Sequence, residues 1–169
     1  MKMFQLNDVL VYGNNGVFRL EDIRNESIMG KTMTYYILEP IFENRSRFYV
    51  PVSNETLTAT LRPVMMKETL HEMMISARDS DVAWQEDDRI RDREFHDIVA
   101  GGMSCDLLRV MKAIILHKIE LKNTVKKLHS ADEKILAACK RIIGEEFAFA
   151  FGVEVDDALS HIESEFIAA

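Results

Sequence analysis

The chain has 169 residues, of which 47% are hydrophobic, and its formal net charge is −7. A chain of this length and composition can bury the core of one ordinary domain or of two small ones, which excludes a disordered tail. No apolar run reaches the roughly 18 to 20 residues that a membrane-spanning helix needs. The negative charge argues against a free-standing, non-specific DNA-binding protein, because phosphate contacts require clustered Lys and Arg.

The charge is unevenly distributed along the chain. Between Arg89 and Arg141 there are 12 Lys or Arg against 7 Asp or Glu. Six acids between Glu72 and Asp88 precede this basic stretch, and seven between Glu145 and Glu165 follow it. A basic segment between two acidic ones predicts a domain with a polarised surface.

Short strand patterns occupy the first 65 residues, which also hold all three prolines. Residues 9–12 are apolar, Gly13-Asn14-Asn15-Gly16 is a strong turn sequence, and residues 17–23 alternate apolar with polar side chains. Further strands are predicted at residues 32–38, 47–50 and 61–64, after a turn at Gly30. So many short strands in so short a segment predict a small, strongly bent sheet or barrel.

After residue 65 the apolar period becomes helical. Helices are predicted at residues 67–77 and 82–99, and the second of these ends at Gly101-Gly102. Ser104 is expected to cap a third helix, and Ser130 with Glu133 to form the capping box of a fourth. Residues 156–166 predict a final short helix. The apolar stripes of the third and fourth helices are Leu107, Leu108, Met111, Ile115 and Ile119, and Leu136, Cys139, Ile143 and Phe147.

The fold class predicted from these patterns is therefore α+β with two domains. Residues 1–65 form a bent β-sheet or barrel, and residues 66–169 form an all-α helical bundle.

The cysteines and the first residues predict a cytoplasmic protein. Cys105 and Cys139 are the only cysteines, and both lie beside aliphatic residues on apolar-periodic segments, as reduced, buried thiols do. The opening residues, Met1-Lys2-Met3-Phe4-Gln5, lack the apolar core and the small-residue cleavage site of a signal peptide.

No set of residues with an enzymatic pattern is found. The sequence has no phosphate-binding glycine loop, no metal-ligand spacing and no serine in a nucleophile-elbow sequence. The five histidines are scattered, and none pairs with another at a ligand spacing. We therefore expect no enzymatic activity, no metal, no cofactor and no small-molecule substrate.

Two features are candidates for binding a partner. An exposed edge strand can pair with a strand of another protein, and Arg45, Arg47 and Tyr49 lie on or beside one predicted strand. An ordinary solvated strand is the alternative. Trp84, the only tryptophan, is predicted at the start of a helix among charged residues, where it is either a core residue or a partly exposed ring that contacts a ligand. Arg89, Arg91 and Arg93 cannot all lie on one helical face, so at most two of them contact one ligand.

The order of several short motifs resembles the CarD/CdnL-type bacterial transcription regulators over nearly the whole chain. The opening residues 4–17, which end in Gly16-Val17, resemble the first strand and turn of that family. The remaining landmarks follow in the family's order: Tyr35-Tyr36-Ile37-Leu38, Val50-Pro51-Val52, Leu61-Arg62-Pro63-Val64, Trp84, Gly101-Gly102, residues 128–136 and Glu145-Glu146-Phe147-Ala148.

The resemblance implies a Tudor-like or SH3-like RNA polymerase-interacting domain at residues 1–65 and a DNA-contacting helical domain at residues 66–169. It implies docking on the polymerase β subunit, largely by strand pairing and basic contacts. The tryptophan then acts as a wedge at the upstream edge of the promoter bubble and stabilises the open complex. The expected location is the cytoplasm, with nucleoid association through RNA polymerase.

The resemblance also implies the residues of each contact. We expect Arg24, Arg45, Arg47, Tyr49 and Val50 to contact RNA polymerase. We expect Trp84, Arg89, Arg91, Arg93 and Lys134 to contact promoter DNA.

The chain departs from the family in two places. Glu86-Asp87-Asp88 follows the tryptophan where relatives have basic residues, and Glu26 and Tyr49 stand where some relatives have arginine. Carboxylates repel phosphates, but tethering to polymerase allows a weak DNA contact to suffice. The alternative function is a polymerase-binding adaptor that has lost the DNA contact.

Overall fold

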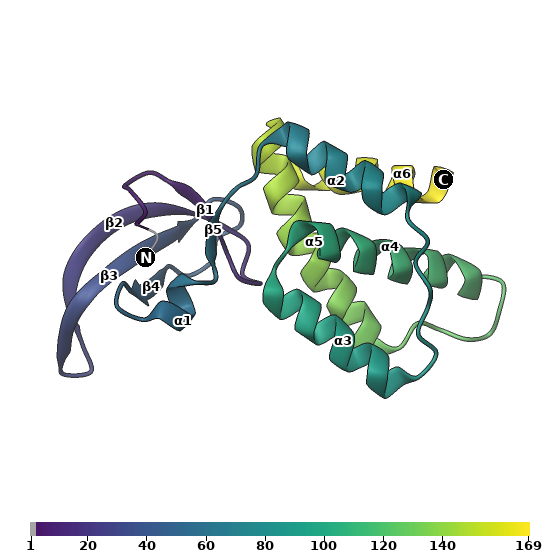
Figure 1. The fold of residues 1–169 in the computed structure, drawn as a ribbon, viewed down its shortest axis with the longest axis horizontal. Coiled ribbons are helices and arrows are strands. Elements are labelled where there is room, and N and C mark those ends of the chain that lie inside the picture. The colour runs from purple at the N-terminus through teal and green to yellow at the C-terminus, as the bar shows by residue number, and fades with distance from the viewer. Residues whose placement is uncertain (1–2) are drawn as a thin grey trace. The chain divides into compact units, whose positions relative to one another are not determined.

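The computed structural model of the protein describes residues 3–169, so Met1 and Lys2, which belong to the segment tested for a signal peptide, lie outside the described residues. The chain divides into two compact units that meet in the sequence between Val64 and Met65. The predicted fold class is confirmed, because a β-rich part is followed by helices (Figure 1).

The first unit is one antiparallel sheet with the strand order β4-β3-β2-β1-β5. A short helix, α1, which the sequence patterns did not predict, connects β4 to β5, and Asn54 caps its N-terminus. The elements are β1 (Val9–Tyr12), β2 (Val17–Ile28), β3 (Lys31–Pro40), β4 (Phe48–Pro51), α1 (Glu55–Thr58) and β5 (Leu61–Pro63).

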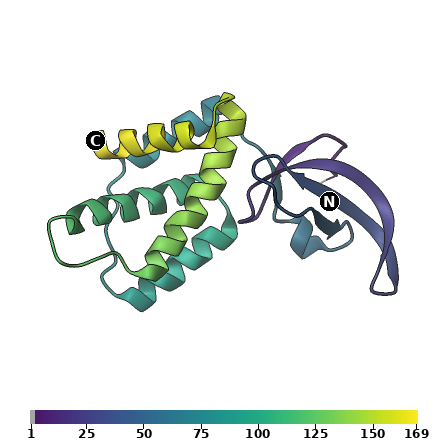
Figure 2. The same cartoon turned by 180° about the vertical axis from the view of Figure 1, so that it is seen from behind.

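The β2–β3 hairpin is longer than predicted, because β2 extends five residues past residue 23. Met29 and Gly30 form its two-residue turn, with φ angles of 53° and 77°. A two-residue turn with both φ angles positive matches the right-handed twist of the strands and lets pairing continue to the end of the hairpin. Figures 1 and 2 show the hairpin as a long, curved ribbon.

Aromatic and aliphatic side chains on one face of the bent sheet form the core of this unit. Phe48 contacts the rings of Tyr12 and Phe18 in T-shaped arrangements, with centroids 5.2 and 5.3 Å apart. A sheet this small buries its apolar face by curling around it. The buried members of the cluster are Phe4, Leu10, Tyr12, Phe18, Leu20, Tyr36, Leu38, Val50 and Leu61.

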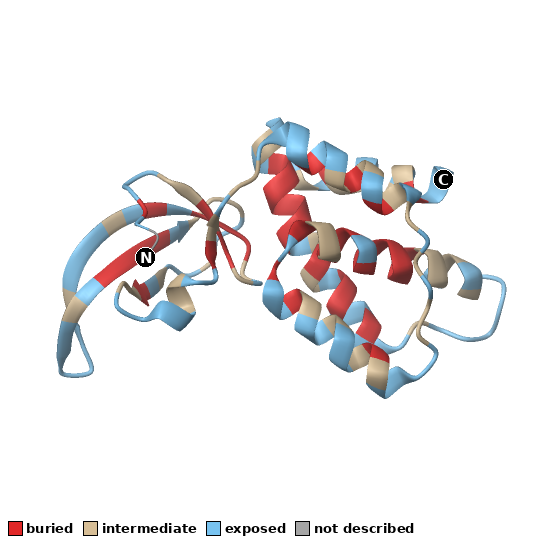
Figure 3. Ribbon diagram, viewed as in Figure 1, coloured by how far each residue is buried: buried red, intermediate tan, exposed pale blue. Residues whose placement is uncertain are grey.

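The second unit is a helical bundle in which α4 and α5 carry most of the buried residues (Figure 3). The apolar stripes predicted for these two helices are buried, except that Ile119 is partly exposed. The helices are α2 (Lys67–Asp79), α3 (Asp88–Gly101), α4 (Ser104–Leu121), α5 (Ser130–Phe151) and α6 (Val155–Ala168).

Helix α3 begins at Asp88, six residues later than predicted. The carboxylate of Asp87 accepts hydrogen bonds from the N–H groups of Arg89 and Ile90, at 3.0 and 3.2 Å, and so fixes the start of the helix. Trp84 therefore lies in an irregular segment before the helix and not in its first turn. The predicted end is confirmed, since Gly102 takes a left-handed conformation with φ of 65°.

The two serine caps predicted for α4 and α5 are wrong, because Ser104 and Ser130 are each the first helical residue and no side chain caps either helix. The buried hydroxyl of Ser104 instead donates a hydrogen bond of 2.5 Å to the carboxylate of Glu146 on α5. Glu146 also accepts a hydrogen bond of 3.1 Å from the N–H of Met65. This buried carboxylate therefore ties the beginning of the helical unit and the start of α4 to α5.

A glycine allows α6 to pack closely on α5. A Cβ atom at Gly144 would lie 3.0 Å from the side chain of Val155 and 3.1 Å from that of Leu159. We predict that Gly144→Leu lowers the unfolding free energy of the helical unit by about 1–3 kcal/mol, because the added side chain overpacks this contact. Urea unfolding followed by the fluorescence of Trp84, which lies in this unit, measures the change.

Gly101→Leu is the matched control, because a Cβ atom there meets nothing within 4 Å. This control is expected to unfold at a urea concentration equal to or above that of the wild type, since leucine is the better helix former. A Gly144→Leu midpoint as high as that of Gly101→Leu would contradict the packing explanation.

The two cysteines differ in exposure, which corrects the expectation that both are buried. Cys139 is fully buried, and burial raises the pKa of its thiol to about 12, whereas Cys105 is partly exposed. Because the thiolate is the reactive form, we predict that iodoacetamide modifies Cys105 in the folded protein and Cys139 only after unfolding. Peptide mass spectrometry measures the rate of modification at each cysteine. Equal rates at the two cysteines would contradict the burial of Cys139.

Candidate functional site

Strand β4 forms one edge of the sheet, because β3 is its only neighbour in the strand order. The N–H of Val52 donates to the carbonyl oxygen of Thr34 on β3 at 3.0 Å. Backbone groups alternate in direction along an antiparallel strand, so those of Val50 also face β3 and those of Tyr49 face away from it. The N–H and C=O of Tyr49 therefore point outward, where a strand from a partner can pair with them.

The side chains predicted to surround this edge differ in their exposure to solvent. The Tyr49 ring is 41% exposed, whereas Val50 is 1% exposed and belongs to the core, so the Val50 side chain is not available to a partner. The expectation that Val50 contacts polymerase is therefore corrected, because only its neighbour Tyr49 presents groups outward.

Each of the three arginines predicted for polymerase contact has partners within the domain. Arg45 is partly buried, its guanidinium donates to the carbonyl oxygens of Asn15 and Phe42, and we assign it a structural role. Arg47 and Arg24 are exposed. Arg47 pairs with Glu21 at 3.1 Å, and Arg24 pairs with Glu26 at 2.6 Å and with Asp22 at 3.1 Å. Exposed ion pairs of this kind contribute little energy, so both side chains can change partner.

In the helical unit, Trp84 is partly exposed and its ring is packed on both faces. The imidazole of His117 on α4 stacks on the indole, with centroids 3.9 Å apart and planes 9° apart. The guanidinium carbon of Arg91 lies over the ring at 4.5 Å from a centroid. Two groups this close to the ring cannot share one face, so they cover opposite faces. Phe95 adds a T-shaped contact, with the ring centroids 6.2 Å apart. Because Trp84 is partly exposed, part of the indole edge remains in contact with solvent.

Arg91 is 3% exposed, and four hydrogen bonds hold its guanidinium. Two go to the carboxylate of Asp132 on α5, at 3.0 and 2.8 Å, and Asp132 is itself 2% exposed. The others go to Asp88 and to the carbonyl oxygen of Gln85, both at 2.8 Å. The hydrogen bonds to Asp132 raise the pKa of Arg91, so the guanidinium remains charged. The expectation that Arg91 contacts DNA is corrected, because its donors are committed inside the domain.

The acidic residues after Trp84 are partly used within the domain. Asp87 caps α3, and Asp88 binds Arg91, which lowers the pKa of the Asp88 carboxyl. His129, just before α5, lies 3.6 Å from Asp88. Two of the three carboxylates that seemed to oppose DNA therefore have partners in the structure, although all three residues are exposed.

Comparison with known protein families identifies the first unit. The family model described as the CarD-like/TRCF RID domain matches residues 4–65. The first unit is therefore similar to the CarD-like/TRCF RID domain. No curated protein gives a significant match to the chain.

The CarD-like RID domain is a protein-interaction domain of transcription-related proteins that interact with RNA polymerase. The match ends at residue 65, next to the boundary between the two units, and so includes the β4 edge. The helical unit lies outside the matched residues.

The other cations predicted for DNA contact are exposed on the helical unit. Arg89 and Arg93 lie on α3, and Lys134 is the fifth residue of α5. The helix N-termini that carry Arg89 and Lys134 are joined by the Arg91–Asp132 ion pair.

The sequence prediction did not include a group of exposed lysines at the end of α4 and in the segment that follows it. Lys118 follows His117 directly, and Lys122, Lys126 and Lys127 lie in the segment between α4 and α5. Four lysines against one acid, Glu120, between residues 118 and 127 were the available signal. These lysines add to the exposed cations of the helical unit.

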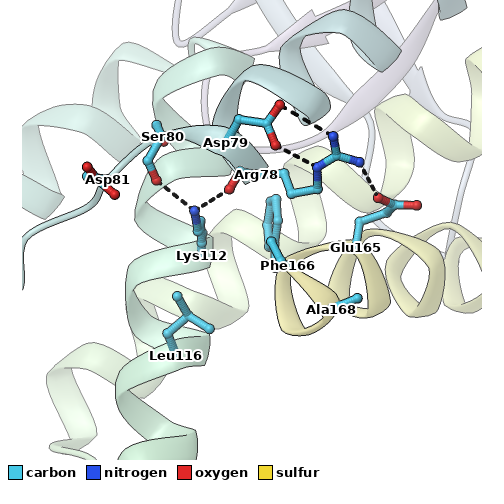
Figure 4. A pocket seen from close by; sticks show the side chains of 10 residues that line it. Arg78, Asp79, Ser80, Asp81, Lys112, Leu116, Glu165, Phe166 and Ala168 are labelled. Carbon is cyan, nitrogen blue, oxygen red and sulfur yellow. Dashed lines mark hydrogen bonds and ion pairs between the residues drawn. The ribbon is translucent and has the colours of Figure 1, made fainter.

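A polar pocket of about 560 Å³ lies beside the C-terminal end of α2 (Figure 4). Its cations are already paired: Lys112 donates to the carbonyl oxygens of Arg78 and Ser80, and Arg78 binds Asp79 and Glu165. These contacts hold the end of α2 against α4 and α6 and leave little charge for a ligand.

Two kinds of site are absent from residues 3–169. No group of three or more His, Cys, Asp or Glu side chains in this part of the chain could hold a metal ion. None of its helices is both long enough and apolar enough to cross a membrane.

Proposed function

We propose that this protein is a bacterial transcription regulator that docks on the RNA polymerase β subunit and contacts promoter DNA at the upstream edge of the bubble. Residues 1–65 dock, and residues 66–169 contact DNA and stabilise the open complex. The observation that carries the proposal is the RID-domain match over a sheet whose β4 edge points its backbone groups outward. The proposed location is the cytoplasm, in association with the nucleoid through polymerase.

Docking proceeds by addition of a polymerase strand to β4. The outward N–H and C=O of Tyr49 supply the main-chain hydrogen bonds, and its exposed ring supplies apolar contact. Arg47 and Arg24 add charge contacts by exchanging their present acidic partners for acids on polymerase. Main-chain pairing contributes most of the binding free energy. Each ion pair formed with polymerase contributes little, because it replaces an ion pair within the domain.

The DNA contact combines the exposed edge of Trp84 with nearby cations. An apolar ring at an unstacked base step offsets part of an unstacking cost of a few kcal/mol. Arg89, Arg93 and Lys134, together with the lysines between α4 and α5, bind the flanking phosphates. Docking raises the effective concentration of the helical domain at the promoter to about millimolar, so a protein of net charge −7 needs only modest intrinsic affinity for DNA.

A polymerase-binding adaptor that makes no DNA contact is the second candidate. The coverage of both indole faces and the seven acids between Glu145 and Glu165 favour it. The two functions share the docking step and differ only in what happens at Trp84.

Tyr49→Pro tests docking by strand pairing. Proline removes the outward N–H of residue 49 without removing a hydrogen bond to β3, so the domain is expected to remain folded. We predict that binding to a purified polymerase β fragment falls at least tenfold, about 1.4 kcal/mol, as measured by titration calorimetry.

Tyr49→Val is the matched control, because it removes the ring and keeps the N–H. Its affinity is expected to lie between those of the wild type and Tyr49→Pro. If Tyr49→Pro binds as tightly as Tyr49→Val while its circular dichroism is unchanged, docking does not use this strand edge.

Trp84→Ala tests the promoter contact. We predict that this variant binds polymerase normally but shortens the lifetime of the open complex severalfold, because the stabilising ring is absent at the unstacked step. Lifetimes are measured by competitor challenge on a linear promoter, and Trp84→Phe, which retains an aromatic ring, is expected to keep part of the effect. A wild-type lifetime for a folded Trp84→Ala protein would favour the adaptor function.

A further inference from the structure

We propose that Asp132 is a positioning residue for Trp84 and acts through Arg91. Asp132 does not contact the indole itself; it fixes the guanidinium that does. This inference rests on the proposed function, because it assigns to a buried ion pair the task of presenting the DNA-contacting ring.

Arg91 contacts both the backbone of the Trp84 segment and the indole side chain. One nitrogen of Arg91 donates to the carbonyl oxygen of Gln85, the residue after Trp84, at 2.8 Å. The same planar group lies over the indole at 4.5 Å. Residues 81–87 form no helix or strand, so this segment lacks the regular backbone hydrogen bonds of those elements. The contacts with Arg91 hold the segment in place instead.

Asp132 in turn fixes the plane of the guanidinium. Its two carboxylate oxygens accept from two different nitrogens of Arg91, and this paired geometry sets orientation as well as distance. Asp132 is buried and projects from the first turn of α5, a 22-residue helix packed at the centre of the bundle. The orientation of Trp84 is thereby linked to a long, largely buried helix of the domain.

His117 completes the positioning from the other side. It projects from α4 and stacks on the indole with planes 9° apart. A ring held between Arg91 and His117 cannot rotate about its side-chain bonds without losing both contacts. DNA therefore meets an indole edge whose direction is set before binding, so little conformational entropy is lost on contact.

Asp132→Asn tests the proposal in the full-length protein, with two readouts. Asparagine keeps the shape of the side chain but loses the charge and one acceptor. Because Trp84 is the only tryptophan, acrylamide quenching of protein fluorescence reports the exposure of this one ring. We expect quenching to rise about twofold as the segment loosens, and the open-complex lifetime to fall to that of Trp84→Ala.

The double variant Asp132→Asn/Trp84→Ala separates positioning from a general structural role. If Asp132 acts through Trp84, the double variant has the same open-complex lifetime as Trp84→Ala alone. Glu133→Gln is the matched control, since it makes the same charge change at the next, exposed residue of α5 and is expected to change neither readout.

Asp132→Glu covers the case in which Asp132→Asn fails to fold. It keeps the charge pair with Arg91 but moves the carboxylate by one methylene, and we expect intermediate quenching and an intermediate lifetime. Wild-type quenching in a folded Asp132 variant would overturn the proposal, and so would a double variant that is shorter-lived than Trp84→Ala. If Trp84→Ala itself leaves the lifetime unchanged, the promoter contact fails, and the quenching result still decides whether Asp132 positions the ring.

Discussion

The arrangement of the helical domain around its single tryptophan depends on a buried ion pair between Arg91 and Asp132. The pair joins α3 to α5, and the remaining donors of Arg91 hold Asp88 and the backbone after Trp84. Burying two charges is costly, and removing one partner of such a pair typically costs about 3–5 kcal/mol. A pair of this kind stabilises one arrangement over its alternatives more than it stabilises the folded state. In this domain, the arrangement that it selects is the position of Trp84.

The same pair bears on whether the acidity of this protein opposes the proposed DNA contact. Counted along the sequence, the carboxylates near Trp84 suggest repulsion of phosphates. In the structure, Asp87 caps a helix, while Asp88 and Asp132 neutralise a buried arginine. Exposed cations on α3, on α5 and between α4 and α5 belong to the same unit, as do the exposed acids Glu94 and Asp97 of α3. Under the proposed docking on polymerase, tethering reduces the affinity for DNA that this unit must supply.

Hydrophobic periodicity was sufficient to predict the β-rich part, the helical part and the stripes of α4 and α5, because burial repeats every two or every 3.6 residues. Contacts between distant residues were not predictable in this way. Arg91 appeared to be one of three surface arginines, since its partner Asp132 is 41 residues away. Ser104 appeared to be a helix cap, because nothing local indicates the carboxylate of Glu146. The polymerase-interacting role was predicted from the ordered motifs of the family and not from the physical chemistry of any one residue.

The most direct test of the central claim is a photo-crosslink from position 83. Ala83 is exposed beside Trp84, so a photoreactive residue there leaves the packed indole in place. In a complex of this protein with RNA polymerase and a promoter, we predict crosslinks to DNA at the upstream edge of the bubble, and their loss with Tyr49→Pro. Crosslinks to protein alone, in a complex that retains this protein on polymerase, would contradict it.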